Sequence, residues 1–163
     1  MSVLREKLKA LFRLKTQGDR TSSTHDPVEI LQLSYRDLLR LARQIDVHAD
    51  QAPYPHVAQL LRRMASEKRQ RAETLKEKIL SLGGDTGDGD LEIRLGKNHW
   101  ERVSIDIEDQ RLLERQFLER ASLLAEKAPE VSSLLQQIVT AELPHREIFL
   151  DLLARADPQA DQT

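Results

Sequence analysis

Three things are scarce in this sequence: cysteine, aromatic residues and long apolar runs. The absence of cysteine excludes disulfides, thiolate zinc sites, iron–sulfur clusters and cysteine nucleophiles. No stretch approaches the roughly 18 apolar residues of a spanning helix, and the N-terminus lacks the apolar core of a secretory signal. Phosphate-binding loops and dinucleotide fingerprints are also missing. We therefore expect a cytoplasmic protein, with peripheral membrane attachment or membership of a larger assembly left open.

Charged and helix-favouring residues are abundant. Asp, Glu, Lys and Arg make up 32 % of the 163 residues, whereas aromatic residues make up 4 %. Leu, Glu, Arg, Lys, Gln and Ala favour helix, and clusters of β-branched residues that would favour strands are few. The composition predicts one all-α domain.

Four helices are expected, at about 27–50, 55–82, 104–128 and 129–156, because apolar residues recur at helical spacing between proline and glycine signals. The first and last connections are short, whereas residues 85–103 could cross the length of a bundle. This order predicts a ferritin-like four-helix bundle over residues 27–156 with one long crossover, followed by a flexible tail at 157–163.

An internal repeat supports this bundle. A shift of 74 residues without a gap places Pro55 on Pro129, Val57 on Val131 and Leu61 on Leu135. The two halves therefore resemble copies of one helical hairpin.

Glu142 and His145 stand one helical turn apart, the Glu-x-x-His arrangement of carboxylate-bridged di-metal bundles, although polar pairs at this spacing also occur on solvated faces. Asp109 stands 33 residues before Glu142, on the preceding helix, and Tyr35 stands 33 residues before Lys68 in the other half. The repeat pairs the residues of the two halves as follows: Glu142 with Lys68, His145 with Arg71, and Asp109 with Tyr35.

Residues 27–156 resemble the ferritin-like superfamily, and in particular the rubrerythrin-type bundle. Two stretches carry the resemblance, YPHVAQLLRRMASEKRQRAETLKEKILSLGG and PEVSSLLQQIVTAELPHREIFLDLL. In that family each half supplies one carboxylate and a Glu-x-x-His, and the six residues hold two iron or manganese ions. The resemblance implies ligands at Asp109, Glu142 and His145. The other half departs from the pattern at every ligand, with Tyr35, Lys68 and Arg71 in those places.

Three interpretations of these positions stay open. In the first, no metal is bound, and a charge cluster fills the former site: Tyr35, Lys68, Arg71, Asp109, Glu142 and His145. In the second, Lys68 and Arg71 extend to solvent and leave His145 as an ordinary core histidine. In the third, Asp109, Glu142 and His145 bind a single iron or manganese ion. Glu67 could replace Lys68 only through a helix bulge.

The segment before the bundle has its own signal. Residues 1–16 carry five basic side chains against one acid, and they read as a basic amphipathic helix joined to the bundle by a linker at 17–26. The residues expected to dock are Leu4, Leu8, Leu11 and Phe12 on the apolar side, with Arg5, Lys9 and Arg13 on the basic side. This helix could enter a protein partner's groove, lie on an anionic membrane surface or fold back onto the bundle.

Several other features have simpler readings. His48 and His99 are expected in loops or on polar faces, without ligand spacing. Pro144 is expected to kink the last helix. Residues 91–105 alternate well enough for a small hairpin inside the crossover, although Trp100 covering the bundle's end is the simpler reading.

Two functions follow from these patterns. The first is a non-catalytic binding or scaffolding module that has lost its di-metal centre and is recruited through residues 1–16. The second is an iron-binding oxidoreductase or iron-handling protein with a reduced site. Nothing in the sequence favours nucleic acid as a partner, and a homo-oligomer stays open.

Overall fold

The computed structural model describes residues 26–87 and 89–156. This part of the chain consists of four helices without any strand: α2 (Pro27–Asp50), α3 (Pro55–Ser81), α4 (His99–Leu124) and α5 (Pro129–Arg155). The all-helical prediction is confirmed. The expected N-terminal helix at 1–16, nearly all of its linker and the tail at 157–163 lie outside the described residues.

The helix ends follow the expected chemistry, with one exception. Asp26 Oδ1 accepts a hydrogen bond of 3.0 Å from Val28 N at the start of α2. Gly83, in the left-handed region at φ +81°, follows the end of α3. The third helix, however, begins at His99, five residues earlier than predicted, because Asn98 caps it by accepting from Glu101 N at 2.8 Å. The hairpin considered for residues 91–105 is therefore absent from the described chain.

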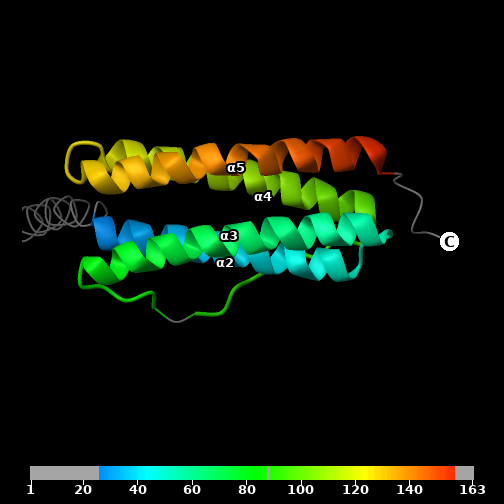
Figure 1. Ribbon diagram of the computed structural model, residues 1–163, viewed down its shortest axis with the longest axis horizontal. Coiled ribbons are helices and arrows are strands. Elements are labelled where there is room, and N and C mark those ends of the chain that lie inside the picture. The colour runs from blue at the N-terminus through cyan, green and yellow to red at the C-terminus, as the bar shows by residue number, and fades with distance from the viewer. Residues whose placement is uncertain (1–25, 88, 157–163) are drawn as a thin grey trace, which may run out of the picture.

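The helices run side by side along the length of the molecule (Figure 1). The start of α2 meets the end of α4, where Arg120 Nη1 donates to Ser34 Oγ at 3.2 Å. The end of α2 meets the start of α4 at His48 and Asp106, so these two helices are antiparallel. Residues 82–98 return along the whole bundle between α3 and α4. The predicted ferritin-like order with one crossover is confirmed.

All four helices contribute apolar side chains to one core. The burial pattern of α3 reappears in α5 at the 74-residue shift. The pairs in which both members are buried are Val57 with Val131, Ala58 with Ser132, Leu61 with Leu135, Met64 with Ile138, Ala65 with Val139, Lys68 with Glu142, and Leu75 with Phe149. Five of the seven pairs join two apolar residues. The pair at Lys68 and Glu142 instead places a charge on each side.

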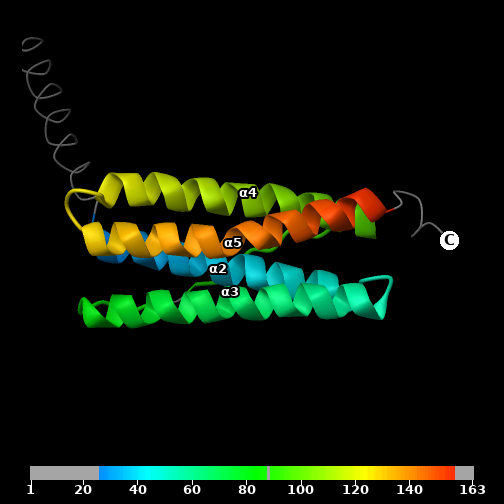
Figure 2. The same cartoon turned by 45° about the horizontal axis from the view of Figure 1, so that its top comes forward.

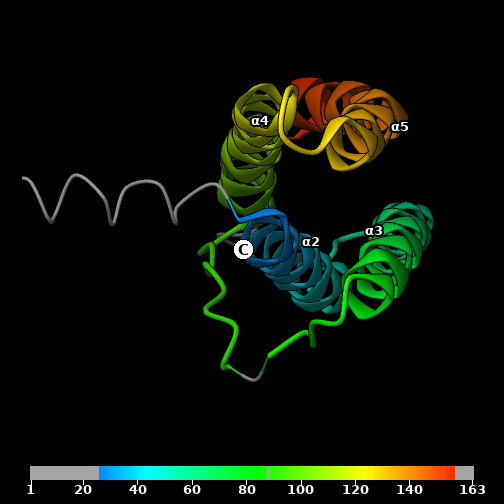
Figure 3. The same ribbon diagram turned by 90° about the vertical axis from the view of Figure 1, so that its left-hand side faces the viewer.

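The four helices are not equally close. Close backbone approaches join α2 with α3, α4 with α5, and α2 with α4, whereas α3 and α5 stand further apart (Figure 3). Long polar side chains bridge α3 and α5 in the middle of the bundle. α5 is one continuous helix (Figure 2). Pro144 lies inside it and is exposed. None of the described helices is long and apolar enough to cross a membrane.

Candidate functional site

Lys68 is the centre of the polar group between α3 and α5. Its side chain is 0 % exposed, so the interpretation in which it extends to solvent is wrong. Its Nζ donates to Glu142 Oε2 and to Gln110 Oε1, each at 2.6 Å, and lies 3.0 Å from His145 Nδ1. An ammonium has three protons to donate, and Glu142 and Gln110 accept two of them. Lys68 is therefore held in the interior by two short hydrogen bonds, with the imidazole of His145 as a third neighbour.

His145 links this group to a second carboxylate. Its Nε2 lies 2.7 Å from Glu67 Oε2. Its Nδ1 faces two further charged groups, Lys68 Nζ at 3.0 Å and Glu142 Oε2 at 2.9 Å. Glu67 reaches the group from the half-exposed rim of α3, without a helix bulge. From the sequence, a role for Glu67 was expected only through such a bulge.

Arg71 closes the group on the side of α5. Its Nη2 donates to the carbonyl oxygen of Ala141 at 2.9 Å. Its Nη1 lies 3.3 Å from Glu142 Oε1, close enough for electrostatic attraction, but neither atom has a hydrogen-bond partner. The guanidinium therefore attracts Glu142 without matching the geometry of a bidentate pair.

α4 contributes Gln110 to the group, where the sequence suggested Asp109. The amide nitrogen of Gln110 lies 3.3 Å from Glu142 Oε2, and its amide oxygen accepts from Lys68. We call the group formed by Glu67, Lys68, Arg71, Gln110, Glu142 and His145 the Lys68 cluster. Tyr35 is half-buried against the hydrophobic core and forms no hydrogen bond with the cluster among the described residues. The expected places of Asp109 and Tyr35 are thus corrected.

Asp109 belongs instead to a second polar group that holds the crossover. Arg94 Nη1 donates to Asp109 Oδ1 at 2.9 Å, and Gln44 Nε2 donates to Asp109 Oδ2 at 2.9 Å. Arg40 Nη2 adds an ion pair with Oδ2 at 3.4 Å. These three partners come from α2 and the crossover. Asp109 therefore faces away from the α3–α5 seam. Gln110, the next residue, faces the seam, because consecutive side chains of a helix are about 100° apart around its axis.

The same group recognises the backbone of Arg94. Arg94 N donates to Gln44 Oε1 at 2.7 Å, and His48 Nε2 lies 3.1 Å from the Arg94 carbonyl oxygen. His48 Nδ1 lies 2.8 Å from Asp106 Oδ2. We call Gln44, His48, Arg94, Asp106 and Asp109 the crossover clasp. His48 is 2 % exposed, so its expected place on a polar face is wrong.

The charged groups of the Lys68 cluster shift one another's pKa values. Burial alone would raise the pKa of Glu142, but the Lys68 ammonium and His145 together outweigh it, and the pKa falls to about 2. Burial lowers the pKa of Lys68, an effect opposed by the Glu142 carboxylate. The hydrogen bond from His145 lowers the pKa of Glu67. Glu142 therefore stays ionised over the whole neutral range.

The Lys68 cluster does not fit a two-metal centre. A cation at this place would need Glu142 Oε2 and His145 Nδ1, and both atoms already face Lys68 Nζ. Two divalent ions also need several carboxylates to neutralise them in a dry interior, whereas here Lys68 and Arg71 supply positive charge. Across residues 26–87 and 89–156, no three Asp, Glu or His side chains are grouped so as to hold a metal ion.

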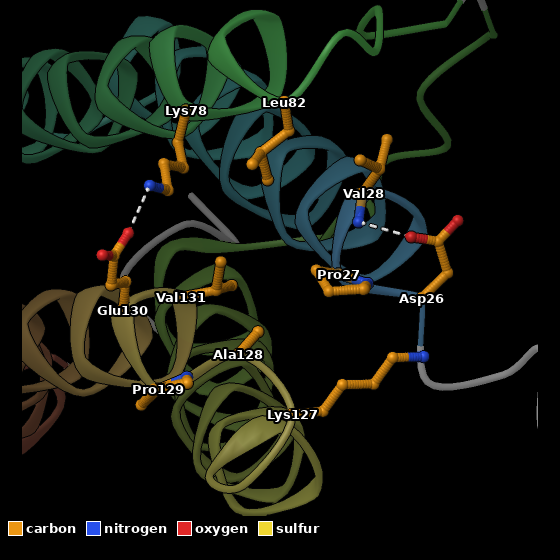
Figure 4. A pocket seen from close by; sticks show the side chains of 10 residues that line it. All are labelled: Asp26, Pro27, Val28, Lys78, Leu82, Lys127, Ala128, Pro129, Glu130 and Val131. Atoms are coloured by element: carbon orange, nitrogen blue, oxygen red, sulfur yellow. Dashed lines mark hydrogen bonds and ion pairs between the residues drawn. The ribbon is translucent and has the colours of Figure 1, made fainter.

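A separate cavity lies at the end of the bundle where α2 and α5 begin (Figure 4). Its volume is about 430 Å³, and its walls include Pro27, Val28, Leu82 and Val131. An ion pair of 3.1 Å between Lys78 and Glu130 spans one side of it. This cavity shares no residue with the Lys68 cluster, so the two features are independent.

Four antiparallel helices, one long crossover and a polar seam between α3 and α5 define a ferritin-like four-helix bundle. Among solved structures, Rhodobacter capsulatus bacterioferritin, determined with a metal-free dinuclear site and haem iron, is similar, with a TM-score of 0.74 and 21 % identity. The match covers 83 % of this chain and 88 % of that one. No protein-family model matches the sequence, and neither does any curated protein. At this identity the likeness concerns the fold.

We expect Lys68→Met to lower the free energy of unfolding by roughly 3 kcal/mol, because it leaves the buried Glu142 without its ammonium partner. Lys76→Met on the same helix is the control, since Lys76 is only half-buried and forms no ion pair within the described chain; its effect should stay below about 0.5 kcal/mol. Urea denaturation of the three proteins measures both values. Equal stabilities for the two variants would contradict the importance of the buried pair.

Acid should weaken the bundle through Glu142. Its pKa lies near 2 in the folded protein, against 4.5 as the ordinary value, so the unfolded chain binds this proton first. The stabilisation is therefore present above about pH 4.5 and is lost as the pH falls toward 2, with a magnitude of roughly 3 kcal/mol. Unfolding free energies of the native protein and of Glu142→Gln, measured from pH 7 to pH 2, should converge at low pH. Parallel profiles would contradict this assignment.

Proposed function

We propose that this protein is a non-catalytic ferritin-like binding or scaffolding module that has lost the di-metal centre and is recruited through residues 1–16. The observation that carries the proposal is Lys68, whose buried ammonium lies 2.6 Å from Glu142 and 3.0 Å from His145. These are the two residues of the Glu-x-x-His pair. One atom of each, Glu142 Oε2 and His145 Nδ1, already faces the protein's own cation.

The charge balance explains how such an interior persists. Lys68 and Arg71 contribute two positive charges, and Glu67 and Glu142 contribute two negative charges. A formally neutral group needs no ion from solution to compensate it. Removal of one member, in contrast, leaves a charge without a partner in the interior, which is strongly unfavourable. Selection for the fold alone would therefore keep the four residues together.

Recruitment through residues 1–16 follows from their apolar side chains and the completeness of the bundle. The apolar stripes of α2, α3, α4 and α5 already cover one another in a common core. Six further apolar residues in an amphipathic pattern then need a second surface, either a hydrophobic groove of a partner protein or an anionic membrane. The net charge of +4 on this segment suits an acidic partner of either kind.

Iron handling is the alternative function, and one observation favours it. Glu67, Glu142 and His145 meet within hydrogen-bonding distance, and Glu114 is buried nearby on α4. Carboxylates and imidazole are ligands that iron accepts. The similar bacterioferritin was solved with haem iron and a metal-free dinuclear site. Displacement of Lys68 would be needed before these groups could bind an ion.

Metal analysis distinguishes the two functions. We expect protein purified from iron-supplied cells to contain less than about one tenth of an equivalent of iron or manganese, and its melting temperature to be unaffected by chelators. Elemental analysis and thermal unfolding with and without a chelator measure these properties. Two ions per chain would refute the proposed loss of the metal centre and support iron handling.

Deletion of residues 1–24 should leave a folded helical bundle that no longer binds its partner or membrane. Circular dichroism and co-sedimentation with vesicles containing anionic lipid measure folding and attachment in the same preparation. Each basic residue near an anionic bilayer contributes on the order of 1 kcal/mol, so membrane attachment should fall steeply with added salt, whereas docking in an apolar protein groove should not.

Leu8→Asn with Leu11→Asn is a second test of the same segment, because it removes apolar surface and keeps the charge. The double variant should stay folded and lose attachment. An unfolded or aggregated deletion variant would show that the segment is part of the core, and the recruitment proposal would then fail.

A further inference from the structure

The cavity at the start of α2 and α5 has apolar walls that the described chain leaves in contact with water. Val28, Val131 and Leu82, at the end of α3, line its volume of about 430 Å³, and Leu82 is 44 % exposed (Figure 4). Two other exposed leucines, Leu80 and Leu123, lie in the last turns of α3 and α4 at the same end of the bundle. We call this cavity the end cavity. Its walls favour an apolar occupant, because the burial of apolar surface is favourable in proportion to its area.

The end cavity lies where residues 1–25 join the bundle. Asp26 lines the cavity and is the first residue of the described chain. An extended linker over residues 17–25 spans up to roughly 30 Å. The helix expected at residues 1–16 would be roughly 24 Å long, at about 1.5 Å per residue. The linker is therefore long enough to let this helix turn back and lay its apolar side on the cavity.

The charge at this end of the bundle also suits residues 1–16. The whole chain carries a net charge of −2 and this segment carries +4, which leaves −6 for the rest of the protein. Glu29 and Glu126, at the start of α2 and in the turn before α5, are exposed and form no ion pair with any described residue. Of the two lysines that line the cavity, Lys78 is paired with an acid, and Lys127 alone opposes a basic occupant among the described lining residues.

We propose that the end cavity is the resting site of residues 1–16, occupied by the apolar side chains of Leu8, Leu11 and Phe12 until a target recruits the segment. The inference rests on the function proposed for residues 1–16 and adds its regulation, since the same side chains cannot contact the cavity and a target at once. A short flexible linker keeps the segment at an effective concentration on the order of 1 mM. Even a weak contact therefore holds the segment in place, and recruitment must compete with it.

Thiol labelling of the full-length protein tests the resting site. The chain contains no cysteine, so the single thiol of Leu82→Cys reports the cover over the cavity. We expect a maleimide dye to label Leu82→Cys at least about fivefold faster when Leu8→Asn and Leu11→Asn are added, because the weakened segment leaves the cavity open. The matched control is Leu95→Cys on the crossover, where the native leucine is 66 % exposed and does not line the cavity. Its labelling rate should be the same in both backgrounds.

Equal labelling rates of Leu82→Cys in the two backgrounds would overturn the resting site. Slow labelling that becomes fast on dilution of the protein would also overturn it, because the cavity would then be covered by the segment of a second copy.

Vesicles containing anionic lipid separate this inference from the recruitment proposal. If the membrane is the target, added vesicles should raise the labelling rate of Leu82→Cys toward that of the variant with Leu8→Asn and Leu11→Asn. Slow labelling that vesicles leave unchanged, without co-sedimentation, would support the resting site and count against recruitment to membranes. Fast labelling without vesicles, together with co-sedimentation, would overturn the resting site and leave recruitment standing.

Discussion

The contact between Lys68 and Glu142 is the interaction on which the centre of the bundle depends. The backbones of α3 and α5 stand apart, and charged side chains fill the space between them, with Lys68 on α3 and Glu142 on α5. Burial of one such charge alone would be prohibitive, so the two must be retained together. Their neighbours Gln110, His145 and Arg71 supply the remaining partners. The geometry of the seam between α3 and α5 is therefore set by electrostatics.

Much of the fold could be predicted from the sequence, because its signals are local. Proline at the first position of three helices, the Asp26 cap and the glycines after α3 each act within one helical turn. The repeat also predicted the contact between Lys68 and Glu142, since the buried faces of α3 and α5 coincide at the 74-residue shift. A sequence repeat predicts contacts correctly where both copies bury the same helix face in the core.

The same repeat failed for α2 and α4 because their buried faces do not coincide. Leu41 and Ile45 are buried on α2, yet the residues 74 positions later, Arg115 and Glu119, are exposed on α4. A one-residue error rotates a side chain by a quarter of a turn, enough to exchange Asp109 for Gln110. The spacing of Gln110 and Glu114 with Phe117 on one stripe is the signal that could have identified both polar residues as buried.

The crossover clasp has a consequence for how freely position 94 can vary. Gln44 and His48 hold the amide and the carbonyl group of residue 94, which every amino acid except proline provides in full. The side chain of Arg94 adds ion pairs with Glu108 and Asp109 but is not what α2 recognises. The path of the connection is thus encoded in α2 rather than in the connection itself. Its surface can diversify through mutation while its route along the bundle stays the same.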